Sequence, residues 1–162
     1  MIRSRARGRA RDEDVIARLD AIAALVYALL HDLAAWLSRT EGPVDRALFP
    51  EYRLPGLADL PSPALRMARY ANPAILEDWE PVIEDWLASG RRYRPSFGRN
   101  LRLAVTDGDP SGPRAEVSFR DRSEVEDPRQ GRCAPGGMWT LTVQLTPDAK
   151  QIATAALRAC PE

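Results

Sequence analysis

The C-terminal part of the chain alternates apolar and polar side chains, and this pattern constrains the fold more than any other feature of the sequence. Turn residues over 107–113 interrupt the alternation, which is clearest in three segments: 101–105, 115–119 and 138–145. A period of two is typical of antiparallel strands that have one buried face and one solvated face. Residues before Gly90 show a helical period instead. Because helices precede strands, we expect an α+β protein with N-terminal helices packed on a curved antiparallel sheet.

Composition is that of one globular domain. The chain has 162 residues, 44% of them hydrophobic and 28% charged, with a formal net charge of zero. A chain of this length can bury a sizeable core without dividing into two domains. We therefore predict a single α+β domain over residues 12–162, helical over 12–90 and forming a sheet over 99–160.

Arginine dominates the first eleven residues, and we predict that this segment, 1–11, is a disordered tail. The tail can contact nucleic acid, anionic lipid or an acidic partner. Alternatively, it is a solvated end without a role. Its basic residues are Arg3, Arg5, Arg7, Arg9 and Arg11.

A long amphipathic helix is expected from about Asp14 to Ser38. Its longest apolar run, 21–30, is too short to cross a bilayer, so we interpret it as a core helix and expect no membrane span. The expected location is the cytoplasm, or a membrane surface if a tether precedes this start. Cys133 and Cys160 lack metal-ligand spacing, and whether they pair is open.

Ser62-Pro63 and Asn72-Pro73 each predict the start of a helix, with a capping residue followed by proline at the first position. Two tryptophans mark the second of these helices, expected over 72–89. Trp79 and Trp86 each follow a Glu-Asp pair and lie seven residues apart, so with Ile75 and Val82 they share one helix face. That face is either part of the core or a docking surface for a protein partner. Pro81 predicts a kink or a restart of the helix.

The region 62–160 resembles small NTF2-like proteins of high-GC Gram-positive bacteria. The resemblance is carried by residues 63–71, by 87–90, by 115–117 and by 139–143. It implies a cone, in which a curved antiparallel sheet wraps around helices. Residues 151–159 fit a helix or a strand by local pattern alone, and the resemblance favours the strand.

Few residues point to chemistry. There is no phosphate-binding glycine motif, and His31 is the only histidine, so we expect no metal site and no cofactor. Tyr27 and His31 lie one helical turn apart. Asp121 would act as a general base if it faced the cone interior, where desolvation raises a carboxyl pKa. Tyr70 and Trp139 are further candidates for the pocket of an NTF2-like isomerase or dehydratase.

The sequence therefore favours a non-catalytic interaction or accessory module of NTF2-like type. Such a module would bind a protein partner or form a homodimer through its sheet. A small-molecule isomerase or dehydratase with a pocket in the cone is the alternative. Nucleic acid would bind only through the N-terminal tail, nonspecifically and with strong salt dependence.

Overall fold

Three helices precede a four-stranded antiparallel sheet in the computed structural model, so the predicted α+β class is confirmed. The structure describes residues 2–37, 54, 56–57, 59–88, 102–120 and 138–159. The helices are α1 (Ile2–Leu37), α2 (Pro63–Tyr70) and α3 (Pro73–Ala88). The strands are β1 (Arg102–Thr106), β2 (Arg114–Arg120), β3 (Met138–Leu145) and β4 (Ile152–Ala159).

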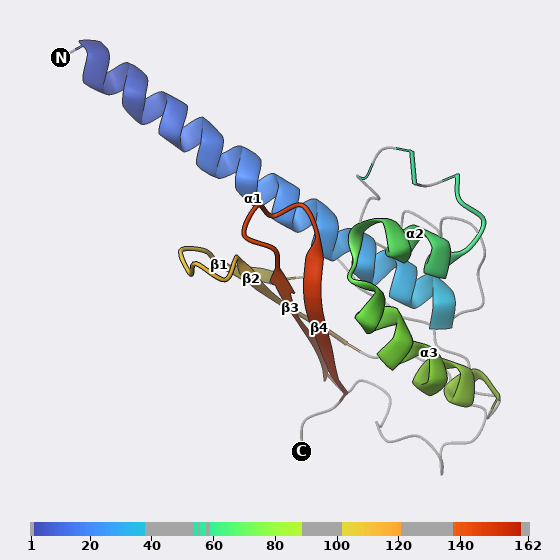
Figure 1. Ribbon diagram of the computed structural model, residues 1–162. Helices are drawn as coiled ribbons and strands as arrows, with labels where there is room; N and C mark the ends of the chain where they lie inside the picture. Colours follow the sequence, from blue (N-terminus) through green and yellow to red (C-terminus); the bar gives the residue numbers. More distant parts are fainter. Residues whose placement is uncertain are drawn as a thin grey trace.

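Helix α1 is the longest element, and its N-terminal half extends well beyond the other elements (Figure 1). We expected the helix to begin near Asp14, after a disordered tail, whereas it begins at Ile2 and includes the Arg-rich segment. Alanine and arginine are strong helix formers, and only Gly8 opposes them in this stretch. The helix that packs in the core therefore extends towards the N-terminus as far as Ile2.

The two short helices begin at the predicted residues. Ser62 caps α2, because its hydroxyl accepts a hydrogen bond from the Leu65 amide at 3.2 Å, and Pro63 follows as the first helical residue. Asn72 precedes α3, and its side chain accepts from the Ala74 amide at 3.0 Å. Helix α3 runs through Pro81 as one element, whereas we expected a kink or a restart there.

The sheet is a simple meander with the strand order β1-β2-β3-β4. Each strand pairs antiparallel with the next, and the final element is a strand, as the resemblance implied. Residues 107–113 join β1 to β2 and residues 146–151 join β3 to β4, and connections this short are possible between antiparallel neighbours. Along the described part of the chain, β1 and β4 therefore form the two edges.

One face of the sheet packs against the helices. One core cluster contains the apolar residues of this sheet face, the apolar stripe of α1 and the buried residues of α2 and α3. The sheet contributes side chains at alternate positions, as expected for strands with one buried face. These are Ala115, Val117, Phe119, Trp139, Leu141, Val143, Leu145 and Ile152.

Candidate functional site

A buried ion pair joins α1 to α2 inside the core. The Arg66 Nε donates to Oδ1 of Asp32 at 2.6 Å, and the two side chains are 1% and 0% exposed. The Tyr70 hydroxyl donates to the other oxygen, Oδ2, at 2.5 Å, and Arg66 Nη1 donates to the Leu60 carbonyl at 3.0 Å. Both carboxylate oxygens of Asp32 are thus hydrogen-bonded within the protein, which offsets the cost of burying the charge.

The sequence did not identify this cluster. Asp32 directly follows His31 in the chain, and Arg66 lies 34 residues further on. Only tertiary packing brings the two together, so no local spacing could show it. A signal was nevertheless available: Asp32 lies within the apolar stripe of a long helix, where an acid needs a partner.

The predicted pair Tyr27 and His31 lies on consecutive turns of α1. His31 is buried and Tyr27 is half-buried, packed against the core cluster. Asp121, the third predicted catalytic candidate, lies outside the described residues. Trp139, named as a pocket residue, packs in the core with its ring stacked on Phe119 at a centroid distance of 6.3 Å.

The acidic residues of α3 are exposed to solvent, whereas Trp79 is half-buried. Ile75 and Ile83 are buried, and Trp79 packs partly buried against the core. Val82, which we expected on the tryptophan face, is 69% exposed, while its neighbour Ile83 is 4% exposed.

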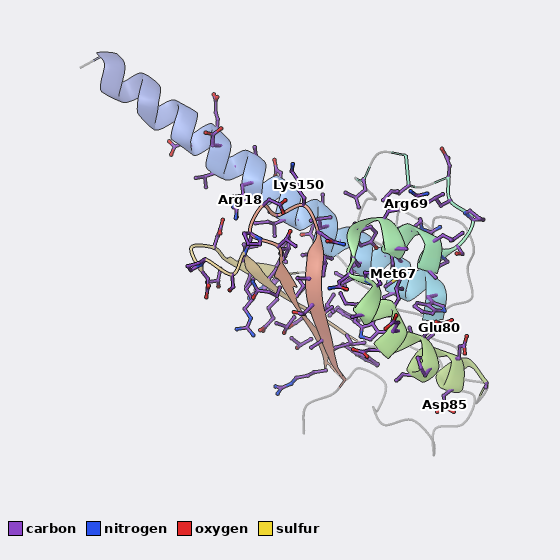
Figure 2. All side chains as sticks on the ribbon, in the orientation of Figure 1. Arg18, Met67, Arg69, Glu80, Asp85 and Lys150 are labelled. Carbon is purple, nitrogen blue, oxygen red and sulfur yellow. The ribbon has the colours of Figure 1, made fainter. Side chains whose placement is uncertain are left out.

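The core side of α3 therefore keeps Ile75 and Trp79 of the expected face and has Ile83 in place of Val82. The side chain of Trp86 lies outside the described residues. Figure 2 labels Glu80 and Asp85 on α3, and both are exposed, whereas Met67 on α2 is fully buried.

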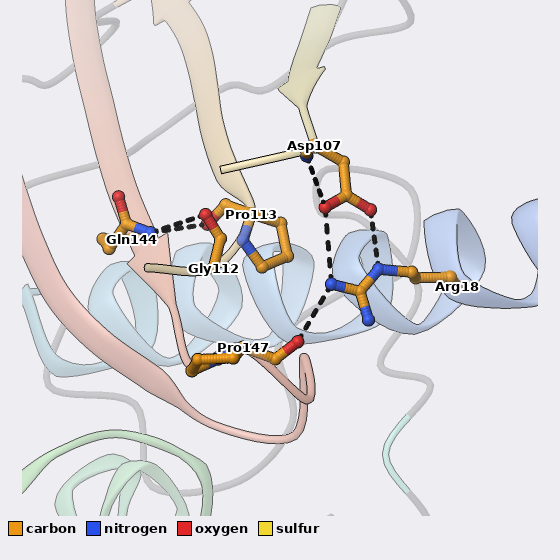
Figure 3. Close-up of polar contacts among 7 residues, drawn as sticks. Arg18, Asp107, Gly112, Pro113, Gln144 and Pro147 are labelled. Atoms are coloured by element: carbon orange, nitrogen blue, oxygen red, sulfur yellow. Dashed lines mark hydrogen bonds and ion pairs between the residues drawn. The ribbon is translucent and has the colours of Figure 1, made fainter. Parts of the chain in front are cut away.

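A second polar cluster links α1 to the turn after β1 and to the turn before β4 (Figure 3). Arg18 Nε lies 2.6 Å from Oδ2 of Asp107, just after β1, and Nη2 lies 3.3 Å from Oδ1. The same Nη2 donates to the Pro147 carbonyl in the turn before β4 at 3.0 Å. One guanidinium thus bridges the helix and two turns.

The electrostatics of this cluster are those of an exposed ion pair. The hydrogen bond from Arg18 holds the pKa of Asp107 below its ordinary value, and the attraction of its charge and the Gly108 amide act in the same direction. The hydrogen bond to Asp107 likewise raises the pKa of Arg18. These contacts position α1 over the sheet, and they hold no group in an unusual protonation state at neutral pH.

Gly112 allows the turn after β1 to approach β3 closely. Its φ is +116°, and a Cβ placed there would lie 2.2 Å from the Leu145 carbonyl oxygen. The amide of Gln144 donates to the Gly112 carbonyl at 2.8 Å (Figure 3). Only glycine fits this conformation and this contact.

The outward face of the sheet is open to solvent. Registered pairs place its side chains in three rows, the central one joining Ala104, Glu116, Thr142 and Ala156. Small and hydroxyl side chains dominate this face, and arginines lie at the corners. In the row beside the central one, the Ser118 and Thr140 hydroxyls are 3.3 Å apart. The exposed arginines of this face are Arg102, Arg114 and Arg158.

The basic N-terminal residues and the cysteines add no described contacts. Residues 3–11 belong to α1, but the structure does not describe the positions of their side chains. Cys133 and Cys160 lie outside the described residues. Among the residues that are described, no group of three or more His, Cys, Asp or Glu side chains could hold a metal ion.

By length and composition, the part of α1 from Asp12 to Trp36 could cross a membrane. An 18-residue window of this segment has a mean hydropathy of 1.4, and 61% of that window is buried within the protein. A core helix satisfies the same criterion, and the Asp32–Arg66 ion pair joins this helix to α2 in the core.

No protein-family model and no curated protein sequence matches the chain. Among solved structures, a de novo designed β-sheet protein determined by solution NMR is similar, with 13% sequence identity and a TM-score of 0.45. The similarity covers 87% of this chain and 89% of the designed protein.

Proposed function

We propose that this protein is a non-catalytic interaction or accessory module, which binds a protein partner or dimerises through its sheet. The proposed architecture is the NTF2-like cone, with the sheet curved around the helices. The observation that carries the proposal is the filling of the space between helices and sheet by apolar side chains. An enzyme of this fold needs polar groups that converge on a ligand cavity in that space.

The filling comes from both layers. Helix α1 contributes Ile22, Val26, Leu29 and Leu33, and the sheet contributes its alternate apolar residues to the same cluster. These α1 residues recur at steps of four, three and four, so they form a single stripe along the helix. The sheet face that packs against this stripe is therefore part of the core.

The buried polar residues support a structural role. Asp32 accepts one hydrogen bond on each oxygen, from Arg66 and from Tyr70, and these donors come from the protein itself. Such a closed arrangement links two helices and fixes their register. It offers no carboxylate for proton transfer to a substrate, because both oxygens are already occupied within a fully buried group.

The sheet supplies the surface that a module of this kind needs. The central row of its outward face has small alanines, Ala104 and Ala156, on the two edge strands, so another protein can approach the backbone of these edges closely. Its arginines are suited to polar contacts at the rim of an interface. Localisation in the cytoplasm belongs to the same proposal and rests on the interpretation of the apolar run 21–30 as part of a core helix.

Sedimentation equilibrium of the full chain tests the proposal. A homodimer through the sheet gives a concentration-dependent rise in mass, which Ala104→Glu or Ala156→Glu lowers when the strand that carries the substituted residue lies in the interface. A protein that stays monomeric, and whose open face tolerates both substitutions without losing any partner, would contradict the proposal.

The second candidate is a small-molecule isomerase or dehydratase, favoured by one observation. The polar residues Asp32, Arg66 and Tyr70 gather inside the core, and His31 and Tyr27 lie on the same part of α1. If this cluster belongs to an active site, Asp32→Asn abolishes turnover of a small carbonyl substrate while the fold persists. In the interaction module, the same variant loses stability and keeps its binding partner.

A further inference from the structure

Strand β1 is an edge whose core side is incompletely covered. It pairs with β2 on one side, and in the described part of the chain no strand pairs with its other side. Leu103 and Val105 point to the core face but stay half-buried. Their neighbours in the same rows, Val117 and Ala115, are each 1% exposed. Burial of the side chains along these rows therefore decreases at β1.

The opposite edge is occupied at its beginning. Ile152, the first residue of β4, forms a parallel bridge with Ala71, and its carbonyl accepts a hydrogen bond from the Asn72 amide at 2.8 Å. The junction of α2 and α3 thus covers the start of β4. The later inward residues of β4, Ala155 and Leu157, are half-buried like those of β1. The two edges differ in that β1 has no described pairing partner beyond β2 at any position.

Strand β1 is short and carries Arg102, but it lacks three other features by which proteins protect an edge: a proline, a bulge and an inward-pointing charge. Natural edge strands carry proline, lysine, a bulge or an inward-pointing charge. Residues 102–106 read Arg-Leu-Ala-Val-Thr, with a regular register and the charged Arg102 on the outward face. The two inward residues are apolar, and so a paired strand would extend the core.

We infer that β1 pairs antiparallel with β1 of a second copy, around a two-fold axis at Ala104. The inference deepens the proposed function, because it rests on the sheet being the interaction surface and names the partner and the edge. In this register Leu103 of each copy faces Val105 of the other, and Ala104 faces Ala104.

The pairing avoids repulsion between like charges. Arg102 of each copy lies opposite Thr106 of the other, so no like charges face each other directly. The two pairs of Leu103 with Val105 join the buried rows of one copy to those of the other. The result is a continuous eight-stranded sheet with the two open faces on the same side, a closed isologous dimer.

Cysteine cross-linking tests the inference in the full chain. Cys133→Ser and Cys160→Ser provide a background without native thiols, into which Ala104→Cys is introduced. Ala156→Cys is the matched control, because the two alanines are exposed in the same row of the sheet and lie at opposite edges. A short bis-maleimide is the probe.

We expect Ala104→Cys to give a cross-linked dimer in high yield and Ala156→Cys to give monomer. Cross-linking through Ala156→Cys alone would overturn the inference and leave the proposed function standing, since the dimer would use the β4 edge. A chain that is monomeric by sedimentation and unlinked at both positions overturns the inference. The proposed function then depends on a different protein partner, which the substitutions on the open face test separately.

A second pair of variants gives an independent readout. Leu103 and Leu157 are half-buried leucines in one row, again at opposite edges. Leu103→Lys places an inward charge on β1 and should abolish dimerisation, whereas Leu157→Lys should retain it. Equal loss from both variants, with folding verified by circular dichroism, would contradict pairing through β1.

Discussion

The guanidinium of Arg66 lies against the carboxylate of Asp32 at 2.6 Å, and both side chains are removed from solvent. This contact joins the C-terminal part of α1 to α2. Because α2 leads directly into α3, which packs beside β4, the ion pair sets how the helical layer lies over the sheet (Figure 1).

Removing one partner of this pair should destabilise the protein strongly. We expect Arg66→Met to lower the free energy of unfolding by about 3–5 kcal/mol, because it leaves Asp32 buried with an uncompensated charge. The double variant Asp32→Leu with Arg66→Met should lose less than the sum of the two single losses. Urea unfolding of all three variants measures the coupling, and additive losses would contradict a direct interaction.

Tyr70→Phe provides a milder test of the same cluster. It removes the hydroxyl that donates to Oδ2 of Asp32 and keeps the ring that packs in the core. A loss of roughly 1–3 kcal/mol is expected, because one oxygen of a buried carboxylate loses its donor. An unchanged midpoint of urea unfolding would show that this hydrogen bond is absent in solution.

The Arg18–Asp107 contact should make stability depend on acid pH. The pKa of Asp107 is lower in the folded protein than its ordinary value, so its contribution is present above the ordinary pKa and is lost as pH falls through the lowered one. We expect Asp107→Asn to melt below the wild type near neutral pH, by a small margin because the pair is exposed. The difference should vanish in strong acid and shrink in high salt. A difference in melting temperature that is constant from neutral to acid pH would contradict this assignment.

Two glycines with positive φ provide a matched pair. Gly108 has φ +128° and open space where a Cβ would lie, whereas a Cβ at Gly112 would meet the Leu145 carbonyl at 2.2 Å. Gly108→Ala should cost roughly 1–3 kcal/mol for backbone conformation alone. Gly112→Ala should cost clearly more, because β3 must also move. Equal losses in thermal unfolding would contradict the close approach.

Neighbouring residues on α3 test which side of the helix faces the core. Ile83→Ala should lower the free energy of unfolding by about 2–5 kcal/mol, as expected for a buried isoleucine. Val82→Ala should change it by less than about 0.5 kcal/mol, because the side chain is exposed. The reverse order of effects would restore the face that the sequence predicted.

The strands and helix starts were accessible from local pattern, while the tertiary contacts were not. Alternation predicted β1 to β3, and Ser62 with Pro63 predicted the start of α2, since both signals lie within a few residues. The fourth strand needed the resemblance, because the alanines of 151–159 suit a helix as well. Arg-rich composition suggested disorder over 1–11, where helix propensity continues α1 instead.

The contacts that organise the core span long distances in sequence. Asp32 and Arg66 are 34 residues apart, and Arg18 and Asp107 are 89 apart, so neither pair follows from spacing. On α3 the predicted face was right at Ile75 and Trp79 and wrong at Val82, because Ile83 packs in the core instead. Bulky tryptophan often covers a core edge while its polar atom stays near solvent.

Amide hydrogen exchange in β1 at two protein concentrations is the most direct measurement of the central claim, that the sheet joins this protein to a second copy. We predict slow exchange over residues 102–106 at high concentration and fast exchange after dilution, while the central strand β3 stays protected at both. Exchange in β1 that is the same at both concentrations would contradict pairing through this edge.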